Sequence, residues 1–184
     1  MSRRRGAPDA VRRSQARSIL RTRFNIPEDA PLVLGAGYGD LRKGIDLFVA
    51  AGARVVGSHA NAVFLWLGGV APEVSEQIAQ AMAANGDASR IVVAPFNADI
   101  APYFDSADLF ALTSREDPFP TVLLQAQDAG LPVVAFQGAG GFDALLGDGA
   151  GELAPLGDTA AFADLVSGIL SDPSRRRDMR AAAL

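Results

Sequence analysis

Short apolar runs alternate with amphipathic segments along the chain, and this alternation limits the possible fold more than any other feature of the sequence. The runs, each short enough to be a buried strand, are PLVLGAG, AVFLWLGG, RIVVAPF, DLFALTS, LPVVAF and, more weakly, GELAPL. Helical spacing of apolar residues predicts helices over about 9–24, 44–56, 73–84, 99–105, 119–130 and 159–171, with a turn at 142–146. Strands that alternate with helices predict an α/β fold with a doubly wound, Rossmann-like parallel sheet.

The length of 184 residues and the hydrophobic content of 49% suit one globular domain with a sizeable core. We divide the chain into a basic helix at 1–24 and a Rossmann-like domain at 25–184. No apolar run approaches the roughly 18 residues that a membrane span needs, and MSRRRGAPDA has no signal-peptide core. The expected location is therefore the cytoplasm, with peripheral attachment at the inner face of the membrane as the alternative.

The composition restricts the chemistry. The chain has no cysteine and one histidine, which excludes thiolate zinc sites and cysteine nucleophiles and disfavours a histidine-based metal site or triad. We therefore expect no metal site built on cysteine or histidine. Any reaction must depend on carboxylates, amides, backbone groups and a few cations.

Charge is unevenly distributed. Both ends are rich in arginine, and we interpret these ends as solvated helix faces. From residue 24 to 170 the chain has 18 acids against five cations, a balance that repels nucleic acid. Those cations are Arg42, Lys43, Arg54, Arg90 and Arg115.

The loops that follow the strands are expected to share one edge of the sheet, where ligands bind in folds of this kind. These loops span 35–44, 68–73, 95–99, 113–120 and 137–143. Arg42, Lys43 and Arg115 fall on them, which indicates an anion site. Lys43, the single lysine, stands before Gly44 at a helix entrance and suits a phosphate.

Two common nucleotide signatures are absent. Gly35 and Gly37 would begin a GxGxxG motif, but Asp40 occupies its third glycine position, and no P-loop surrounds Lys43. The sequence therefore gives little support to a dehydrogenase or a P-loop enzyme.

The stretch TSREDPFP precedes the predicted helix that begins near residue 120. Pro118 and Pro120 fix the backbone for helix entry, and the first-turn N–H groups of Thr121, Val122 and Leu123 have no partner inside the helix. Such donors favour an anion. An alternative of about equal weight is that Glu116 and Asp117 only complement the helix dipole.

At these residues the chain resembles a known family. SREDPFPTVLLQAQDAGLPVVAF is similar to the E-x7-E segment of retaining glycosyltransferases of the two-domain GT-B type, family 4, also called glycosyl transferases group 1. DLRKGIDLF resembles their Lys-Gly loop, ADLFALTSRED their approach strand and GAGGFDALLGDGAGELAPLGD their Gly-Gly loop. The four motifs keep the family's order over residues 31–171 and cover its C-terminal, donor-binding domain.

This resemblance implies a function and a site. The family transfers a sugar, with retention, from a nucleotide-diphospho-sugar to a glycan, a lipid-linked sugar or a small molecule, and needs no bound metal. The resemblance therefore implies no metal and no cofactor, since the nucleotide sugar is a substrate. Because the N-terminal acceptor domain is missing from the match, we expect the chain to bind the donor but to be inactive in transfer alone. The implied catalytic residues are Asp117, Lys43 and Arg42. The implied donor-binding residues are Gly37, Tyr38, Arg115, Glu116, Phe119, Pro120, Thr121, Val122, Gln125, Phe96, Gly140 and Gly141.

Within that site, the resemblance assigns Lys43 to the donor diphosphate, Asp117 to hydroxyls of the sugar and Gln125 to the ribose. Gln125 stands where the family has its second acid, and Tyr38 where it often has an arginine. These two changes keep a non-catalytic nucleotide or sugar-phosphate binding module open as an alternative. A Rossmann-like sugar-nucleotide enzyme of the epimerase type is a further alternative.

Overall fold

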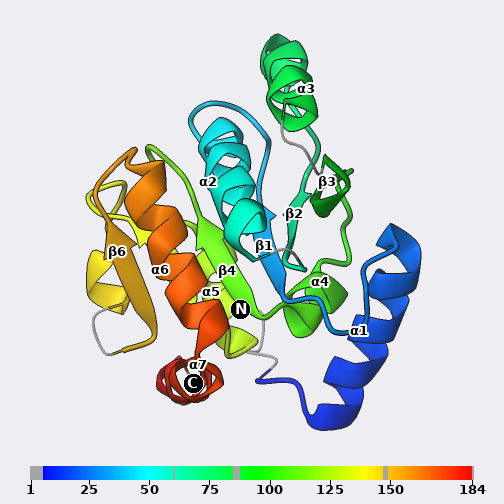
Figure 1. The fold of residues 1–184 in the computed structure, drawn as a ribbon. Helices are drawn as coiled ribbons and strands as arrows, with labels where there is room; N and C mark the ends of the chain where they lie inside the picture. Colours follow the sequence, from blue (N-terminus) through cyan, green and yellow to red (C-terminus); the bar gives the residue numbers. More distant parts are fainter. Residues whose placement is uncertain (1–5, 60, 85–87, 147–148, 184) are drawn as a thin grey trace.

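The protein forms one parallel β-sheet covered by helices on both faces (Figure 1). The computed structural model describes residues 6–59, 61–84, 88–146 and 149–183. The sheet has six strands in the order β3-β2-β1-β4-β5-β6, and every neighbouring pair is parallel. The strands are β1 (Leu32–Ala36), β2 (Val63–Leu67), β3 (Ile91–Ala94), β4 (Leu109–Leu112), β5 (Val133–Phe136) and β6 (Gly151–Ala154). The predicted doubly wound sheet is confirmed, and each strand lies inside the apolar run that predicted it.

Burial along the strands follows their place in the sheet. Every residue of β1, β2, β4 and β5 is buried, whereas the edge strands β3 and β6 are partly exposed. This accounts for the weaker apolar signal of GELAPL, since an edge strand packs against a neighbour on one side only. Phe48 lies edge-on to both Phe64 and Trp66, at centroid distances of 5.3 Å, and fills the core between helix and sheet.

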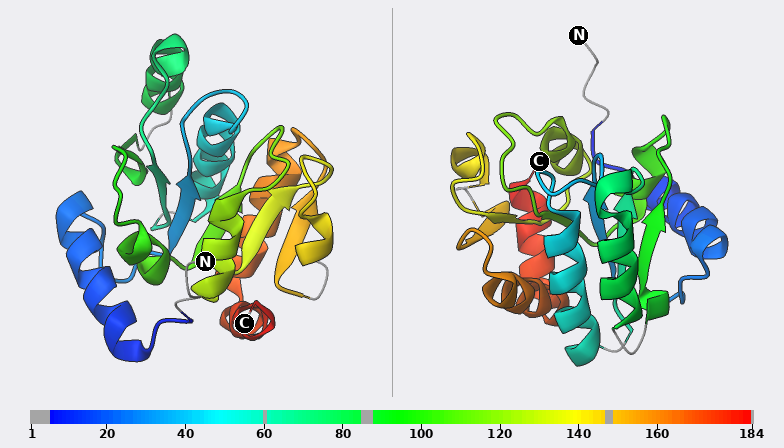
Figure 2. Two further views of the ribbon diagram at one scale, coloured as in Figure 1. Left: turned by 180° about the vertical axis from the view of Figure 1, so that it is seen from behind. Right: turned by 90° about the horizontal axis from the view of Figure 1, so that it is seen from above.

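Most of the helices occupy the segments that sequence periodicity predicted, but the last one, at Pro173–Ala182, lies beyond them. They are α1 (Ala10–Phe24), α2 (Ile45–Ser58), α3 (Ser75–Ala83), α4 (Ala101–Ser106), α5 (Thr121–Asp128), α6 (Thr159–Ser171) and α7 (Pro173–Ala182), with short 3-10 helices η1 (Pro72–Val74), η2 (Ala88–Arg90) and η3 (Asp143–Leu146). The α2 and α6 helices pack together on one face of the sheet, while α5 and the packed pair of α1 and α4 lie on the other (Figures 1 and 2). Among the described residues, no helix is both long and apolar enough to cross a membrane.

The terminal helices α1 and α7 meet the sheet at its amino edge, where arginines bind buried acids. The Asp108 carboxylate, just before β4, lies 3.1 Å from Arg17 on α1 and 3.6 Å from Arg180 on α7, and it accepts a hydrogen bond from the Leu32 N–H at 3.0 Å. Arg12 pairs with Asp105 at 3.0 Å. The interpretation of the basic ends as solvated helix faces is therefore wrong for these arginines, because acids 72 or more residues away in sequence hold them.

Arg180 is the most strongly perturbed of these groups. Burial lowers the pKa of Arg180 to about 10, nearby arginines lower it further, and Asp108 opposes the shift. The side chain still carries its charge at neutral pH. Its ion pair with Asp108 thus offsets part of the desolvation cost of placing a cation between α7 and the sheet.

Candidate functional site

The loops after β1 and β4 meet at the point where the strand order reverses, the usual place for a ligand in a doubly wound sheet. The Thr113 hydroxyl donates to the Gly44 carbonyl at 2.9 Å, and the Arg115 N–H donates to the Arg42 carbonyl at 2.8 Å. These hydrogen bonds hold the two loops together at the carboxyl edge of the sheet. They bring residues about 70 positions apart into one site.

Glycines allow this close approach. Gly44 has φ +72° at the N-cap of α2, and a Cβ there would lie 1.9 Å from the Thr113 carbonyl oxygen. A Cβ on Gly140 would lie 1.9 Å from the Asp117 carbonyl oxygen. Side chains at either position would force the backbones apart, so the loops after β1, β4 and β5 form one packed unit.

Lys43 and Asp117 face one another across this unit. The Lys43 Nζ atom lies 2.5 Å from the Asp117 Oδ2 atom. The Ser114 hydroxyl, 3.4 Å away, donates to the same oxygen. Asp117 is 5% exposed, whereas the Lys43 side chain, at 18%, keeps some contact with solvent. The residues assigned by resemblance to diphosphate and to sugar thus form an ion pair with each other.

Arg42 and Arg115 are also held by protein acceptors. Arg115 makes a bidentate pair with Asp46, at 2.7 and 2.6 Å, and donates to the Leu41 carbonyl. The hydrogen bond to Asp46 raises the pKa of Arg115. Arg42 donates to the Glu116 carbonyl at 3.2 Å. The geometry gives Arg115 a role in fastening the loops, and its contact with a donor stays a prediction.

The α5 helix points its N-terminus at the same edge. Pro120 is the N-cap residue, and within the described chain no acceptor satisfies the N–H groups of Thr121 and Val122. The prediction of a free N–H at Leu123 is wrong, because this group donates to the Pro120 carbonyl at 2.9 Å. Two free donors and the helix dipole remain as a positive end.

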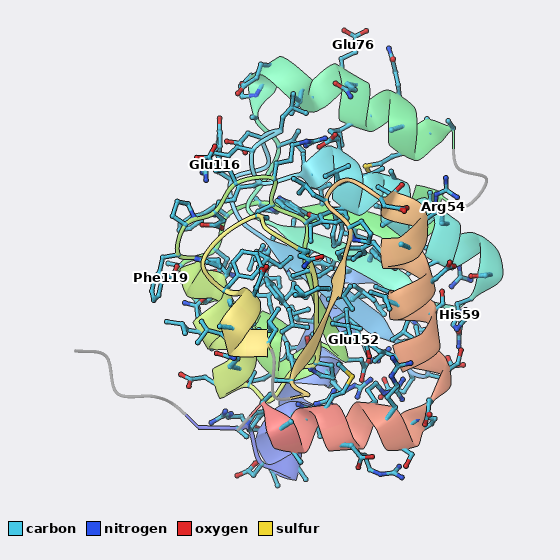
Figure 3. All side chains as sticks on the ribbon, turned by 90° about the vertical axis from the view of Figure 1, so that its left-hand side faces the viewer. Arg54, His59, Glu76, Glu116, Phe119 and Glu152 are labelled. Atoms are coloured by element: carbon cyan, nitrogen blue, oxygen red, sulfur yellow. The ribbon has the colours of Figure 1, made fainter. Side chains whose placement is uncertain are left out.

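Three aromatic side chains stand exposed on the loops at this edge. Tyr38, Phe96 and Phe119 are 55%, 79% and 65% exposed. Figure 3 shows Phe119 and Glu116 at one edge of the molecule, on the side opposite Arg54 and His59. Exposed rings of this kind offer flat apolar faces to a base, a sugar or a protein partner.

Gln125 and the loop after β5 complete the predicted set. Gln125 is half-buried, and its Oε1 atom has no hydrogen-bond partner among the described residues. Beyond Gly140, which touches the Asp117 backbone, a Cβ on Gly141 would lie 3.5 Å from the Pro118 carbonyl oxygen. Asp143 accepts the Gly138 N–H at 3.0 Å and fastens this loop.

The site includes residues that sequence reasoning missed. Asp40 caps the Lys43 N–H at 2.7 Å, and its position three residues before that N–H is a recognisable capping signal. Asp46 and Ser114 gave no such signal, because the partners they serve become neighbours only in the folded chain. In the part of the chain that the structure describes, no group of three or more His, Cys, Asp or Glu could hold a metal ion.

The protein is similar to known glycosyltransferases. The sequence profile described as Glycosyl transferases group 1 matches residues 30–172. The D-inositol 3-phosphate glycosyltransferase of Xylanimonas cellulosilytica is 32% identical over 170 residues, which cover 91% of this chain and 40% of that protein. The chain therefore spans less than half the length of this curated relative.

Solved structures agree in fold. Anabaena Alr3699/HepE in complex with UDP-glucose superposes with a TM-score of 0.84 at 23% identity, over 96% of this chain and 48% of that protein. The C-terminal domain of the glycosyl transferase group 1 family protein LpcC from Francisella tularensis gives 0.81 at 18% identity, over 96% of this chain and 91% of that domain. Nearly the whole chain thus has the fold of a C-terminal glycosyltransferase domain.

Proposed function

This chain belongs to the glycosyl transferases group 1 family, and on that premise we propose that it binds the nucleotide-diphospho-sugar donor of a retaining glycosyltransferase. The proposed reaction moves the sugar to an acceptor with retention at the anomeric carbon and without a metal or cofactor. The acceptor, a glycan, a lipid-linked sugar or a small molecule, would bind to a further domain. These residues alone would bind the donor without transferring its sugar, in the cytoplasm or at the inner face of the membrane.

The observation that carries the proposal is the presence of positive groups on adjoining loops at the carboxyl edge. Lys43 and the free N–H groups of Thr121 and Val122 come from loops joined at the strand-order reversal. A cation together with a helix N-terminus favours phosphate oxygens. Fixed groups of this kind also stabilise the negative charge that a leaving nucleoside diphosphate develops.

The remaining roles follow from position. Asp117 would accept hydrogen bonds from sugar hydroxyls, and the unpartnered Gln125 amide oxygen would accept one from the ribose. Phe96, the most exposed of the three aromatic residues, would stack on the base. HepE was solved with UDP-glucose, which supports a nucleoside diphosphate as the leaving group.

A non-catalytic binding module is the second candidate. It is favoured by the Lys43–Asp117 ion pair, which occupies both groups, and by Gln125 and Tyr38 in place of the family's usual acid and arginine. The family match speaks against an enzyme of the epimerase type.

Thermal unfolding of the purified chain against UDP, GDP, ADP and their sugar conjugates tests donor binding. A ligand at about a hundred times its dissociation constant stabilises by about 2.7 kcal/mol, which raises Tm by roughly 5–10 °C at this chain length. Lys43→Met removes the ammonium but keeps an aliphatic stem against Gly37, and we expect it to abolish the shift. Arg54→Ala is the matched control, because it removes an exposed cation from the side of the molecule opposite Phe119 (Figure 3).

A shift that survives Lys43→Met would contradict this site. If no nucleotide shifts Tm at millimolar concentration, donor binding by this chain is wrong.

A further inference from the structure

We propose that Asp117 makes the site prefer an intact sugar nucleotide over the free nucleoside diphosphate, because Asp117 and an incoming diphosphate compete for the ammonium of Lys43. This inference rests on the proposed function. It goes further by giving Asp117 a part in distinguishing the donor from the spent leaving group.

Asp117 is fixed in place. Its N–H donates to the Ala139 carbonyl at 2.7 Å, and its own carbonyl lies against the Cα of Gly140, where a Cβ would come within 1.9 Å. The side chain is buried under the loop. The carboxylate therefore cannot follow Lys43 if the ammonium moves.

Lys43, in contrast, has a fixed backbone and a movable end. Asp40 caps its N–H at 2.7 Å, and its aliphatic stem lies 3.5 Å from the position of a Cβ on Gly37. The ammonium sits at the end of a flexible four-carbon chain that is partly open to solvent. It can turn from Asp117 toward a phosphate near the α5 N-terminus while its backbone stays in place.

Such a turn leaves a buried carboxylate without its cation. Among the described groups, only the Ser114 hydroxyl still donates to it, at the long distance of 3.4 Å. A buried charge that loses its partner is strongly unfavourable unless other donors replace it. Sugar hydroxyls on an intact donor supply O–H groups to Asp117, whereas a bare diphosphate brings only further negative charge.

The same competition acts after transfer. Once the sugar has left, the hydroxyl donors leave with it, and Asp117 again attracts Lys43. The ion pair then re-forms at the expense of the phosphate contact. Asp117 thereby lowers the affinity for the spent nucleotide more than it lowers the affinity for the donor.

Isothermal titration of the chain with matched pairs tests the inference. The pairs are UDP and UDP-glucose, GDP and GDP-mannose, and ADP and ADP-glucose. In the wild type we expect the sugar nucleotide of the binding pair to bind about tenfold or more tightly than the free diphosphate. Asp117→Asn removes the competing charge but keeps a hydrogen-bonding group, so the free diphosphate should gain about tenfold while the sugar nucleotide gains much less or loses.

Glu73→Gln is the matched control, because it removes an exposed carboxylate from η1, which follows β2 at the same edge of the sheet. A general loss of negative charge would strengthen both ligands alike in both variants. The proposal requires that only Asp117→Asn changes the ratio. Asp117→Ser gives the same test if the asparagine variant does not fold.

The outcomes separate the inference from the proposed function. If ligands bind and Asp117→Asn leaves the ratio unchanged, the role of Asp117 is wrong and donor binding stands. If no pair binds to the wild type or to the variant, donor binding fails and the inference fails with it. A lowered ratio with the Glu73→Gln ratio unchanged supports both.

Discussion

Asp108 and Asp117 stand at the two ends of β4, are almost equally buried at 7% and 5%, and are used differently. Asp108, at the amino edge, has two arginine partners and one backbone N–H. Asp117, at the carboxyl edge, has one lysine at 2.5 Å and a distant serine hydroxyl. The amino edge thus saturates its acid with donors from α1, α7 and β1, while the carboxyl edge holds its acid with one movable cation.

This difference separates a fully paired carboxylate from one that is only partly paired. Three donors from three elements make Asp108 a fixed junction, and removing it would leave two cations close together without an anion. Close to Asp117 in the chain, the N–H groups of Thr121 and Val122 have no acceptor among the described residues, and the Phe119 ring is exposed. Incomplete satisfaction costs stability and leaves binding capacity for a ligand.

The largest effect on stability is expected for Asp108→Asn, and the same substitution at Asp117 is its comparison. We expect Asp108→Asn to lower the free energy of unfolding by about 4 kcal/mol, because two arginines lose their anion, and to lower Tm by roughly 8–16 °C. Asp117→Asn should cost less than about 1 kcal/mol, since Lys43 can turn to solvent. Urea unfolding of the two variants measures both values, and equal losses would contradict the distinction between the two edges.

The next effect concerns the glycines of the carboxyl edge. Gly44→Ala should lower the free energy of unfolding by about 3 kcal/mol. The new Cβ would clash with the Thr113 carbonyl, and alanine would also be strained at the positive φ of this position. Gly69→Ala is the matched control, with φ +78° and no atom within 4 Å of its Cβ, and should cost about 1 kcal/mol. Thermal unfolding compares them, and similar losses would show that the close contact between the loops contributes little.

The smallest effect is expected at the exposed ion pair between Arg115 and Asp46. Arg115→Lys keeps the charge but loses the bidentate pair with Asp46, and since this pair is exposed, the cost should stay below about 1 kcal/mol. The difference from wild type should shrink between about 0.05 M and about 1 M salt. A loss of donor affinity far larger than the loss of stability would instead assign Arg115 to the ligand.

Most of the fold was predictable because its signals are local. Each strand was visible as an apolar run, and α1 and α6 begin within one residue of the predicted start. On one side of α5, the small residues Ala126 and Ala129 are both buried, which their size alone does not predict. Small residues signal close packing as readily as open space, and only the neighbouring layer decides between them.

The sequence predicted which residues belong to the candidate site better than it predicted which of them contact each other. The sequence motifs, and the position of the loops at the carboxyl edge of the sheet, indicated Lys43, Asp117 and the N-terminus of α5. The pairing of Lys43 with Asp117, of Arg115 with Asp46 and of Arg17 with Asp108 was not indicated. Each pair joins residues 69 to 91 positions apart, so no spacing rule could connect them.

By itself, then, the sequence determined the parallel α/β fold, the edge where a ligand would bind and the family. These follow from apolar periodicity and from motifs whose residues lie close together in the chain. The tertiary structure alone decided which cation meets which acid. That choice depends on how two glycine-lined loops and two terminal helices are brought together, and packing fixes it after the local elements have formed.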